Sequence, residues 1–183
     1  MTGPTGMAGT RPALPDATNA DFLLQALRET NARRALHHAP PLTMDALLVD
    51  YAKTRAAAHS RGEAGDIRAG TGENVFRSTG MSTGMSTGMS TGMSTGMSTG
   101  MSTGMSTGMS DAAQAVASWY AEPYDWDDPR PCHFSRLVWT SSTVMGAARV
   151  AGQGPSHYET YIVFVFEPAG DVEGEHQENV LRA

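Results

Sequence analysis

The chain has 183 residues and a formal net charge of −6 at pH 7, a length that corresponds to one domain. An acidic chain lacks the attraction to phosphate that drives non-specific nucleic-acid binding, so we expect no nucleic-acid partner. No apolar run reaches the length of about 18 residues that a membrane span requires, so we expect none.

The cysteine content limits how the fold is stabilised. Cys132 is the one cysteine of the chain, so no intrachain disulfide can form. We therefore expect a fold that is stable without disulfides and compatible with a reducing compartment. The N-terminal residues contain no basic stretch followed by an apolar stretch, and we expect no signal peptide there.

The first elements along the chain are a tail and two helices. Residues 1–18 are rich in Thr, Gly and Pro and predict a disordered tail, after which 19–183 form a single domain. Residues 21–38 carry apolar side chains at helical spacing, with Asn19 or Asp21 as the N-cap. Residues 43–58 predict a second helix, which begins at Thr43 as its N-cap. Both apolar stripes indicate packing against a core.

Residues 78–109 are eight tandem copies of Ser-Thr-Gly-Met. A helix there would lose about 1 kcal/mol at every Gly, and a strand would present a face of Gly and Ser that packs against nothing. We therefore predict a disordered loop inserted into the domain. Evenly spaced thioethers leave two alternatives open, binding of Cu(I) and contact with a lipid surface.

The C-terminal half changes from helix to strand. Ser110 is the expected N-cap of a third helix, which ends before Pro123. Residues 144–151 and 158–166 have strand character, and the second segment is apolar on both faces. A strand with two apolar faces lies in the middle of a layered structure. Helices followed by strands predict an α+β fold.

Several short motifs occur in a fixed order. Gly72-Glu73-Asn74-Val75 precedes Trp119-Tyr120-Ala121-Glu122, the segment from Cys132 to Trp139 follows, and Pro168-Ala169-Gly170-Asp171-Val172 comes last. Together they resemble the CAP superfamily, which includes cysteine-rich secretory proteins, venom allergens and plant pathogenesis-related class 1 proteins. The resemblance covers about Leu27 to Val180.

Further positions match this family, and a few depart from it. Asn31 and Arg34 match its opening Asn-x-x-Arg, and Pro40-Pro41-Leu42 matches the Pro-Pro-Leu before its second helix. The departures are residues that replace the usual types: Cys132 for Gly, Arg136 for Gln or Ala, Phe166 for Tyr, and Asp171 for Asn. We expect these changes to alter local geometry more than the fold.

The resemblance implies a three-layer α-β-α sandwich and a central cavity lined by two His and two Glu. Residue by residue, these are His59, Glu73, Glu122 and His133. Two imidazoles and a carboxylate suit Zn²⁺ or another divalent cation, so this set is the candidate metal site. Glu73 and Glu122 are the candidate catalytic residues. The remaining histidines are weaker candidates, and we expect His157 and His176 to be solvated.

For function, the resemblance favours a non-catalytic, secreted-type binding protein with a role in host interaction or defence. Its ligand would be a small apolar molecule such as a sterol or fatty acid, and a membrane surface is a further partner that the family implies. The family also favours an extracellular location. The alternative is a metal-dependent hydrolase or protease centred on His59, Glu73, Glu122 and His133, although the chain contains no His-Glu-x-x-His motif.

Overall fold

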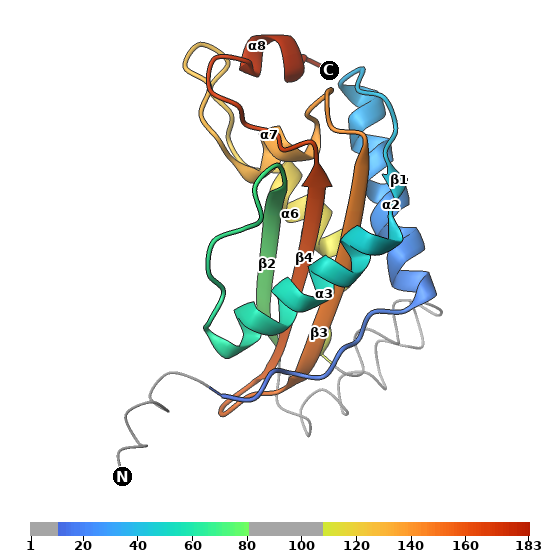
Figure 1. The fold of residues 1–183 in the computed structure, drawn as a ribbon, viewed down its shortest axis with the longest axis vertical. Coiled ribbons are helices and arrows are strands. Elements are labelled where there is room, and N and C mark those ends of the chain that lie inside the picture. Colours follow the sequence, from blue (N-terminus) through green and yellow to red (C-terminus); the bar gives the residue numbers. More distant parts are fainter. Residues whose placement is uncertain (1–10, 81–107) are drawn as a thin grey trace.

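A computed structural model describes residues 11–80 and 108–183. Within them, a four-stranded sheet lies between helices that cover both of its faces (Figure 1). The elements in chain order are α2 (Ala20–Leu36), β1 (Thr43–Met44), α3 (Ala46–Arg61), β2 (Gly72–Gly80), α6 (Ala112–Tyr120), α7 (His133–Leu137), β3 (Val144–Gln153), β4 (Tyr158–Glu167) and α8 (His176–Asn179).

The sheet has the order β1-β3-β4-β2. The two-residue strand β1 pairs with β3 in parallel, whereas β3 with β4 and β2 with β4 are antiparallel pairs. Strand β4 is thus hydrogen-bonded to β3 on one edge and to β2 on the other. Its residues from Glu159 to Phe166 are all buried. This confirms the prediction of a central strand with two apolar faces.

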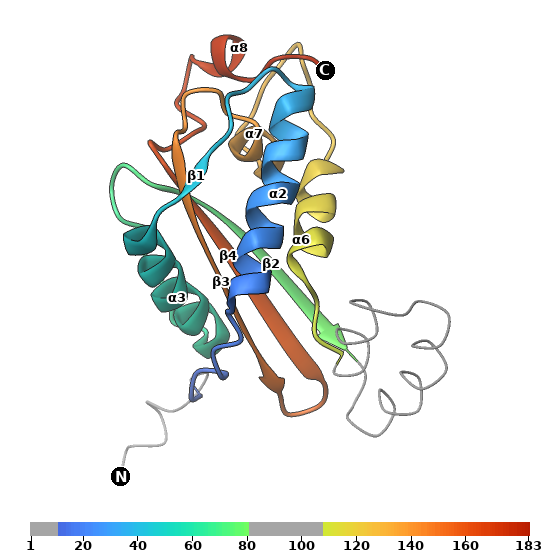
Figure 2. The same cartoon turned by 90° about the vertical axis from the view of Figure 1, so that its right-hand side faces the viewer.

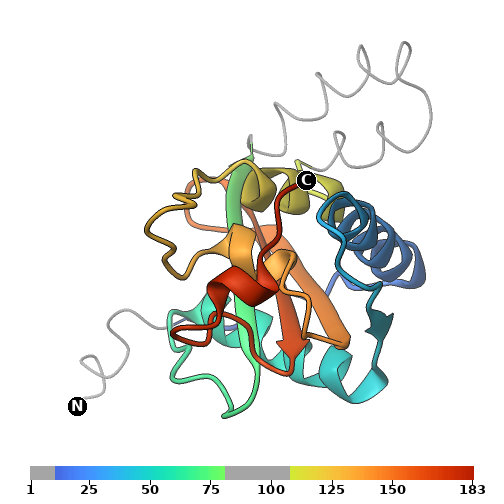
Figure 3. The same ribbon diagram turned by 90° about the horizontal axis from the view of Figure 1, so that it is seen from above.

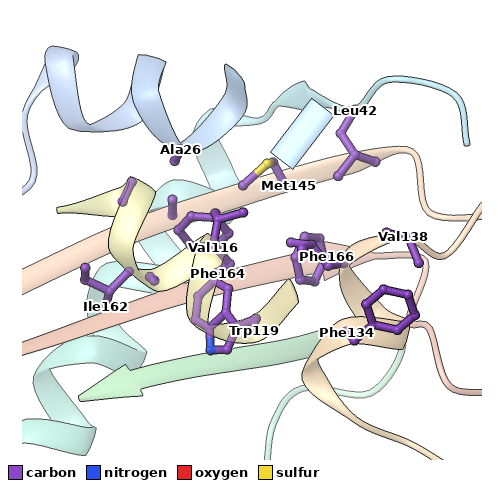
Figure 4. Packing of buried hydrophobic residues seen from close by; sticks show 14 of the residues in the cluster. Ala26, Leu42, Val116, Trp119, Phe134, Val138, Met145, Ile162, Phe164 and Phe166 are labelled. Atoms are coloured by element: carbon purple, nitrogen blue, oxygen red, sulfur yellow. The ribbon is translucent and has the colours of Figure 1, made fainter. Parts of the chain in front are cut away.

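The two faces of β4 belong to two separate hydrophobic clusters. Ile162, Phe164 and Phe166 pack with residues of α2, α6 and α7 (Figure 4). Tyr161, Val163 and Val165 pack with residues of α3 on the opposite face. Helix α3 therefore covers one face of the sheet and α2 with α6 the other, as Figure 2 shows from the side and Figure 3 from above. The predicted α+β, three-layer α-β-α sandwich is confirmed.

Capping side chains set the helix starts, and two of the predicted caps are wrong. Asn19, one of the two predicted N-caps of α2, is confirmed: its side chain accepts a hydrogen bond from the N–H of Phe22. Thr43 is in β1, and α3 begins three residues later than predicted because Asp45 accepts from the N–H of Leu48. The predicted cap Ser110 is also wrong: Asp111, the next residue, caps α6 in a reciprocal arrangement with Gln114.

Parts of the two segments that the sequence predicted to be disordered are ordered in the structure. Residues 11–18 pack on the domain: Leu14 is buried, and the N–H of Ala17 donates to the carbonyl of Arg149 at 2.7 Å. The first repeat copy continues β2 through Gly80, opposite Tyr158, because the edge of β4 offers backbone partners along its whole length. The rest of the predicted tail and loop, 1–10 and 81–107, lies outside the described residues.

Among residues 11–80 and 108–183, no helix is both long enough and apolar enough to cross a bilayer.

Arg34 explains why the Asn-x-x-Arg motif stands near the end of α2. Its guanidinium is fully buried and donates to the carbonyls of Pro40 and Trp139 at 2.8 Å, Leu137 at 3.1 Å and Ser142 at 3.2 Å. Burial lowers the pKa of Arg34 to about 10. One side chain therefore joins α2 to the chain between α7 and β3.

Replacing Arg34 by Met should destabilise the fold strongly. The variant keeps the apolar stem but leaves several buried carbonyls without a donor, which should lower the free energy of unfolding by about 3 kcal/mol or more. Urea unfolding followed by circular dichroism measures it. Arg33→Met is the matched control, because Arg33 loses a partly exposed ion pair with Glu29 and a contact with the Tyr120 ring at 5.6 Å, which together should cost less than about 1 kcal/mol. Equal losses in the two variants would contradict the role assigned to Arg34.

Candidate functional site

The first half of the predicted tetrad lies between α3 and β2. His59 is in the last turn of α3, and its Nε2 is 3.2 Å from Oε2 of Glu73, the second residue of β2. Arg55, one helical turn before His59, donates from Nε and Nη2 to the two oxygens of Glu73 at 2.7 and 2.8 Å. The carboxylate of Glu73 therefore has both oxygens bound by a guanidinium in a bidentate pair.

The environment of Glu73 strongly favours its charged form. Burial alone raises the pKa of this carboxyl, but the hydrogen bonds from Arg55 and His59 and their charges outweigh burial and lower the pKa to about 2. Arg55 is itself buried and also donates to the carbonyl of Gly65 at 2.8 Å. The pair thus holds the end of α3, the following loop and the start of β2 together.

The second half of the tetrad lies at the start of α7. Oε2 of Glu122 is 2.6 Å from Nδ1 of His133, and Oε1 accepts from the backbone N–H of His133 at 2.9 Å. The indole of Trp119 is stacked on the imidazole, with ring centroids 6.0 Å apart. Both side chains of the pair are about one-third exposed, so a ligand can reach them.

Successive residues of β2 contact the two pairs. Glu73 contacts α3, and the next side chain, Asn74, projects to the other face of the strand and donates to the carbonyl of His133 at 3.0 Å. The Oδ1 atom of Asn74 is buried and accepts no hydrogen bond from any described residue. In the Gly-Glu-Asn motif, Glu73 therefore belongs to the pair with His59, and Asn74 contacts the backbone of His133 in the other pair.

The structure forms each His–Glu pair but does not assemble the four residues into one ligand set. Among residues 11–80 and 108–183, no group of three or more His, Cys, Asp or Glu side chains is placed to hold a metal ion. Both oxygens of Glu73 already accept hydrogen bonds from Arg55, so a cation here would compete with a bidentate ion pair. As arranged, these residues do not fit a resident Zn²⁺ or other divalent cation.

A cleft that the sequence did not reveal lies between the loop after α6 and the C-terminal helix α8. It has a volume of about 230 Å³. We call it the aromatic cleft. Its walls are formed by Tyr124, Trp126, Pro129, His176, Gln177, Val180, Leu181 and Arg182. The rings of Tyr124 and Trp126 meet edge to face at 4.8 Å, and the guanidinium of Arg182 lies 4.6 Å from the centre of the Trp126 ring.

A family model described as the cysteine-rich secretory protein family, CAP, matches residues 27–166. The chain belongs to the CAP family. The secreted protein PRY1 of Candida albicans (strain SC5314 / ATCC MYA-2876) is 25% identical over 169 residues, which are 91% of this chain and 34% of that protein. The chain therefore spans about a third of the length of this curated relative.

Solved structures of other proteins have the same fold. MpPR-1i is 18% identical with a TM-score of 0.58, and the match covers 87% of this chain and 96% of that one. NaASP2, solved with Zn²⁺, is 16% identical with a TM-score of 0.51, covering 92% and 90%. At these identities the comparison confirms the CAP fold and nothing finer.

Two of the departures from the CAP pattern form an ion pair with each other. Nε of Arg136 is 3.2 Å from Oδ2 of Asp171, which also accepts from the N–H of Cys132 at 3.1 Å. Oδ1 of Asp171 accepts from the hydroxyl of Ser135 and lies 2.9 Å from Nε2 of His176. Arg136 and Asp171, which both differ from the residues usual in the family, thus form one ion pair with each other.

The prediction that His176 is solvated is wrong. Its side chain is 8% exposed, pairs with Asp171 and meets the Trp139 ring edge to face at 5.1 Å. His37 is also buried, between the Tyr120 hydroxyl at 2.8 Å and the Leu181 carbonyl at 2.6 Å. The sequence signal for His176 was the acidic residue that replaces Asn five positions earlier.

The low pKa of Glu73 predicts a specific acid sensitivity. The folded-state pKa of about 2 is below the unfolded value of 4.5, so the stabilisation is complete above about pH 5 and is lost as the pH falls toward 2. Its size is on the order of 3 kcal/mol. The free energy of unfolding, measured by urea titration between pH 2 and 7, should fall less steeply with acid in Glu73→Gln than in the wild type.

Glu63→Gln is the control for this measurement, because Glu63 forms an exposed ion pair with Arg61. This variant should keep the wild-type pH profile. A wild-type profile in Glu73→Gln would show that the Arg55–Glu73 pair does not stabilise the fold.

Proposed function

We propose that this CAP domain is a non-catalytic, secreted-type binding protein that takes a fatty acid or sterol in the aromatic cleft. The observation that carries the proposal is the cleft itself, which places aromatic and aliphatic side chains beside the guanidinium of Arg182. Clefts of this kind suit amphipathic small molecules, since apolar surface supplies affinity and a few polar groups fix orientation.

The chemistry of the cleft favours the fatty acid of the two ligands. Tyr124, Trp126 and Leu181 offer apolar surface, and the guanidinium of Arg182 can bind a carboxylate head group. A volume of about 230 Å³ is below the roughly 300–1,000 Å³ of pockets that enclose a whole drug-sized ligand. The cleft therefore holds part of a long acyl chain while the remainder stays outside.

The His–Glu pairs support a binding role rather than the hydrolase alternative. A zinc hydrolase needs several protein ligands at one metal and an open position for water. NaASP2 has been solved with Zn²⁺, but in this chain both oxygens of Glu73 are bound by Arg55. The extracellular location that we propose rests on relatives named as secreted.

Equilibrium binding of radiolabelled palmitate and cholesterol tests the proposal. The wild type should bind palmitate saturably and more tightly than cholesterol, because only palmitate has a carboxylate for Arg182. Trp126→Ala should weaken palmitate binding about tenfold, through loss of the ring from one wall. Gln177→Trp should weaken it as well, because Gln177 is exposed on α8 and a larger side chain there fills the cleft without disturbing the core.

Tyr158→Ala is the matched control, since Tyr158 is a partly buried aromatic residue at the opposite end of β4. It should bind palmitate like the wild type. Saturable binding that none of the substitutions changes would place the ligand elsewhere on the domain. No saturable binding of either lipid would refute the proposed function.

A further inference from the structure

A second hollow lies at the end of the molecule opposite α8, and the proposed lipid-binding function does not use it. Its volume is about 320 Å³. Residues from the N-terminal segment, the end of α3, β2 and the β3–β4 hairpin meet there (Figure 1). We call it the arginine hollow. Its lining consists of Arg11, His59, Ser60, Arg61, Gly62, Arg77, Pro155, Glu159 and Tyr161.

Fixed side chains form the floor of the arginine hollow. Arg11 donates from both terminal nitrogens to the carboxylate of Glu159, at 3.2 and 2.5 Å, and from Nε to the Ser60 carbonyl at 2.7 Å. The hydroxyl of Tyr161 is 3.3 Å from Oε1 of Glu159 and accepts from Nε of Arg77 at 2.9 Å. This network positions donors before any ligand arrives, which lowers the entropy cost of binding.

Of the three arginines that line the hollow, Arg77 is the one for which the described residues supply no carboxylate at ion-pair distance, although its guanidinium lies 5.6 Å from the centre of the Tyr161 ring. Arg11 is paired with Glu159, Arg61 with Glu63, and Glu73, which contacts His59, is paired with Arg55. Arg77 is exposed, and among the described residues its only hydrogen bond is the one to the Tyr161 hydroxyl. Arg77 lines the hollow, and its two terminal nitrogens carry four N–H groups that form no hydrogen bond with the described residues.

We propose that the arginine hollow binds a phosphoryl group, with Arg77 as the principal ligand and Arg11 and Arg61 beside it. A guanidinium fork matches the geometry of phosphate oxygens and donates two parallel hydrogen bonds. The local charge favours an anion, because three arginines line this hollow although the chain as a whole carries −6. The phosphoryl group belongs either to a small phosphate ester or to a phospholipid head group.

Two measurements distinguish these sources. Isothermal titration with inorganic phosphate reports binding of the free group, and co-sedimentation with phosphatidylcholine vesicles containing phosphatidic acid reports a lipid head group. Binding in either assay should weaken at least about tenfold in Arg77→Gln, which loses the charge-assisted hydrogen bonds. Arg77→Lys keeps the positive charge but lacks the planar guanidinium, so its binding should be weaker than that of the wild type and stronger than that of Arg77→Gln.

Arg28→Gln is the matched control, because Arg28 is exposed on α2, on the other face of the sheet, and should bind like the wild type. The thermal midpoint of each variant shows that the fold is intact. Equal phosphate and vesicle binding by Arg77→Gln and Arg28→Gln would overturn the proposal, as would no binding in either assay. Because palmitate binding involves the opposite end of the domain, it should be unchanged in Arg77→Gln, so failure of one proposal is separate from failure of the other.

Discussion

The buried guanidinium of Arg34 is the contact on which the arrangement of the C-terminal half depends. A charge without a carboxylate partner is costly inside a protein unless polar groups replace the lost water. Here four backbone carbonyls do so, and they belong to Pro40 and to the stretch between α7 and β3. Since His133 begins α7, the geometry of the Glu122–His133 pair depends on a residue of α2.

A second guanidinium determines what the other His–Glu pair can do. A carboxylate beside an imidazole is half of a metal site, but Glu73 is already neutralised by Arg55, which arrives from the same helix as His59. A divalent ion at this position would have to displace a bidentate ion pair and leave the buried Arg55 without a counter-charge, which is unfavourable. The side chains that resemble a metal centre therefore act as a connection between α3 and β2.

Much of the fold was predictable from the sequence, because apolar periodicity and motif order record which faces are buried. The two apolar faces of residues 158–166 correctly predicted the central strand β4 and the layers on each side of it. Helix starts were less predictable, since Thr43 and Asp45 are both good N-caps. Pairing of β1 with β3 decided between them.

The candidate site was predictable only in part. Family resemblance named His59, Glu73, Glu122 and His133 as one set, whereas the structure brings His59 to Glu73 and His133 to Glu122 as two separate pairs. The resemblance could not show that Arg55 binds Glu73, because that contact depends on the register between a helix and a strand 18 positions apart. The aromatic cleft and the arginine hollow could not be predicted from the sequence either, because each is lined by residues from segments that are distant in the chain.

The departures from the CAP pattern bear directly on the aromatic cleft. Asp171 is nearly buried and binds Arg136 of α7 on one side and His176 of α8 on the other. His176 is also part of the cleft wall, so the ion pair fixes where α8 stands relative to the loop that carries Trp126. An Asn at position 171 would lack the charge that holds Arg136, and the wall would lose a connection to the core. Two residues that depart from the CAP pattern thus position one wall of the aromatic cleft.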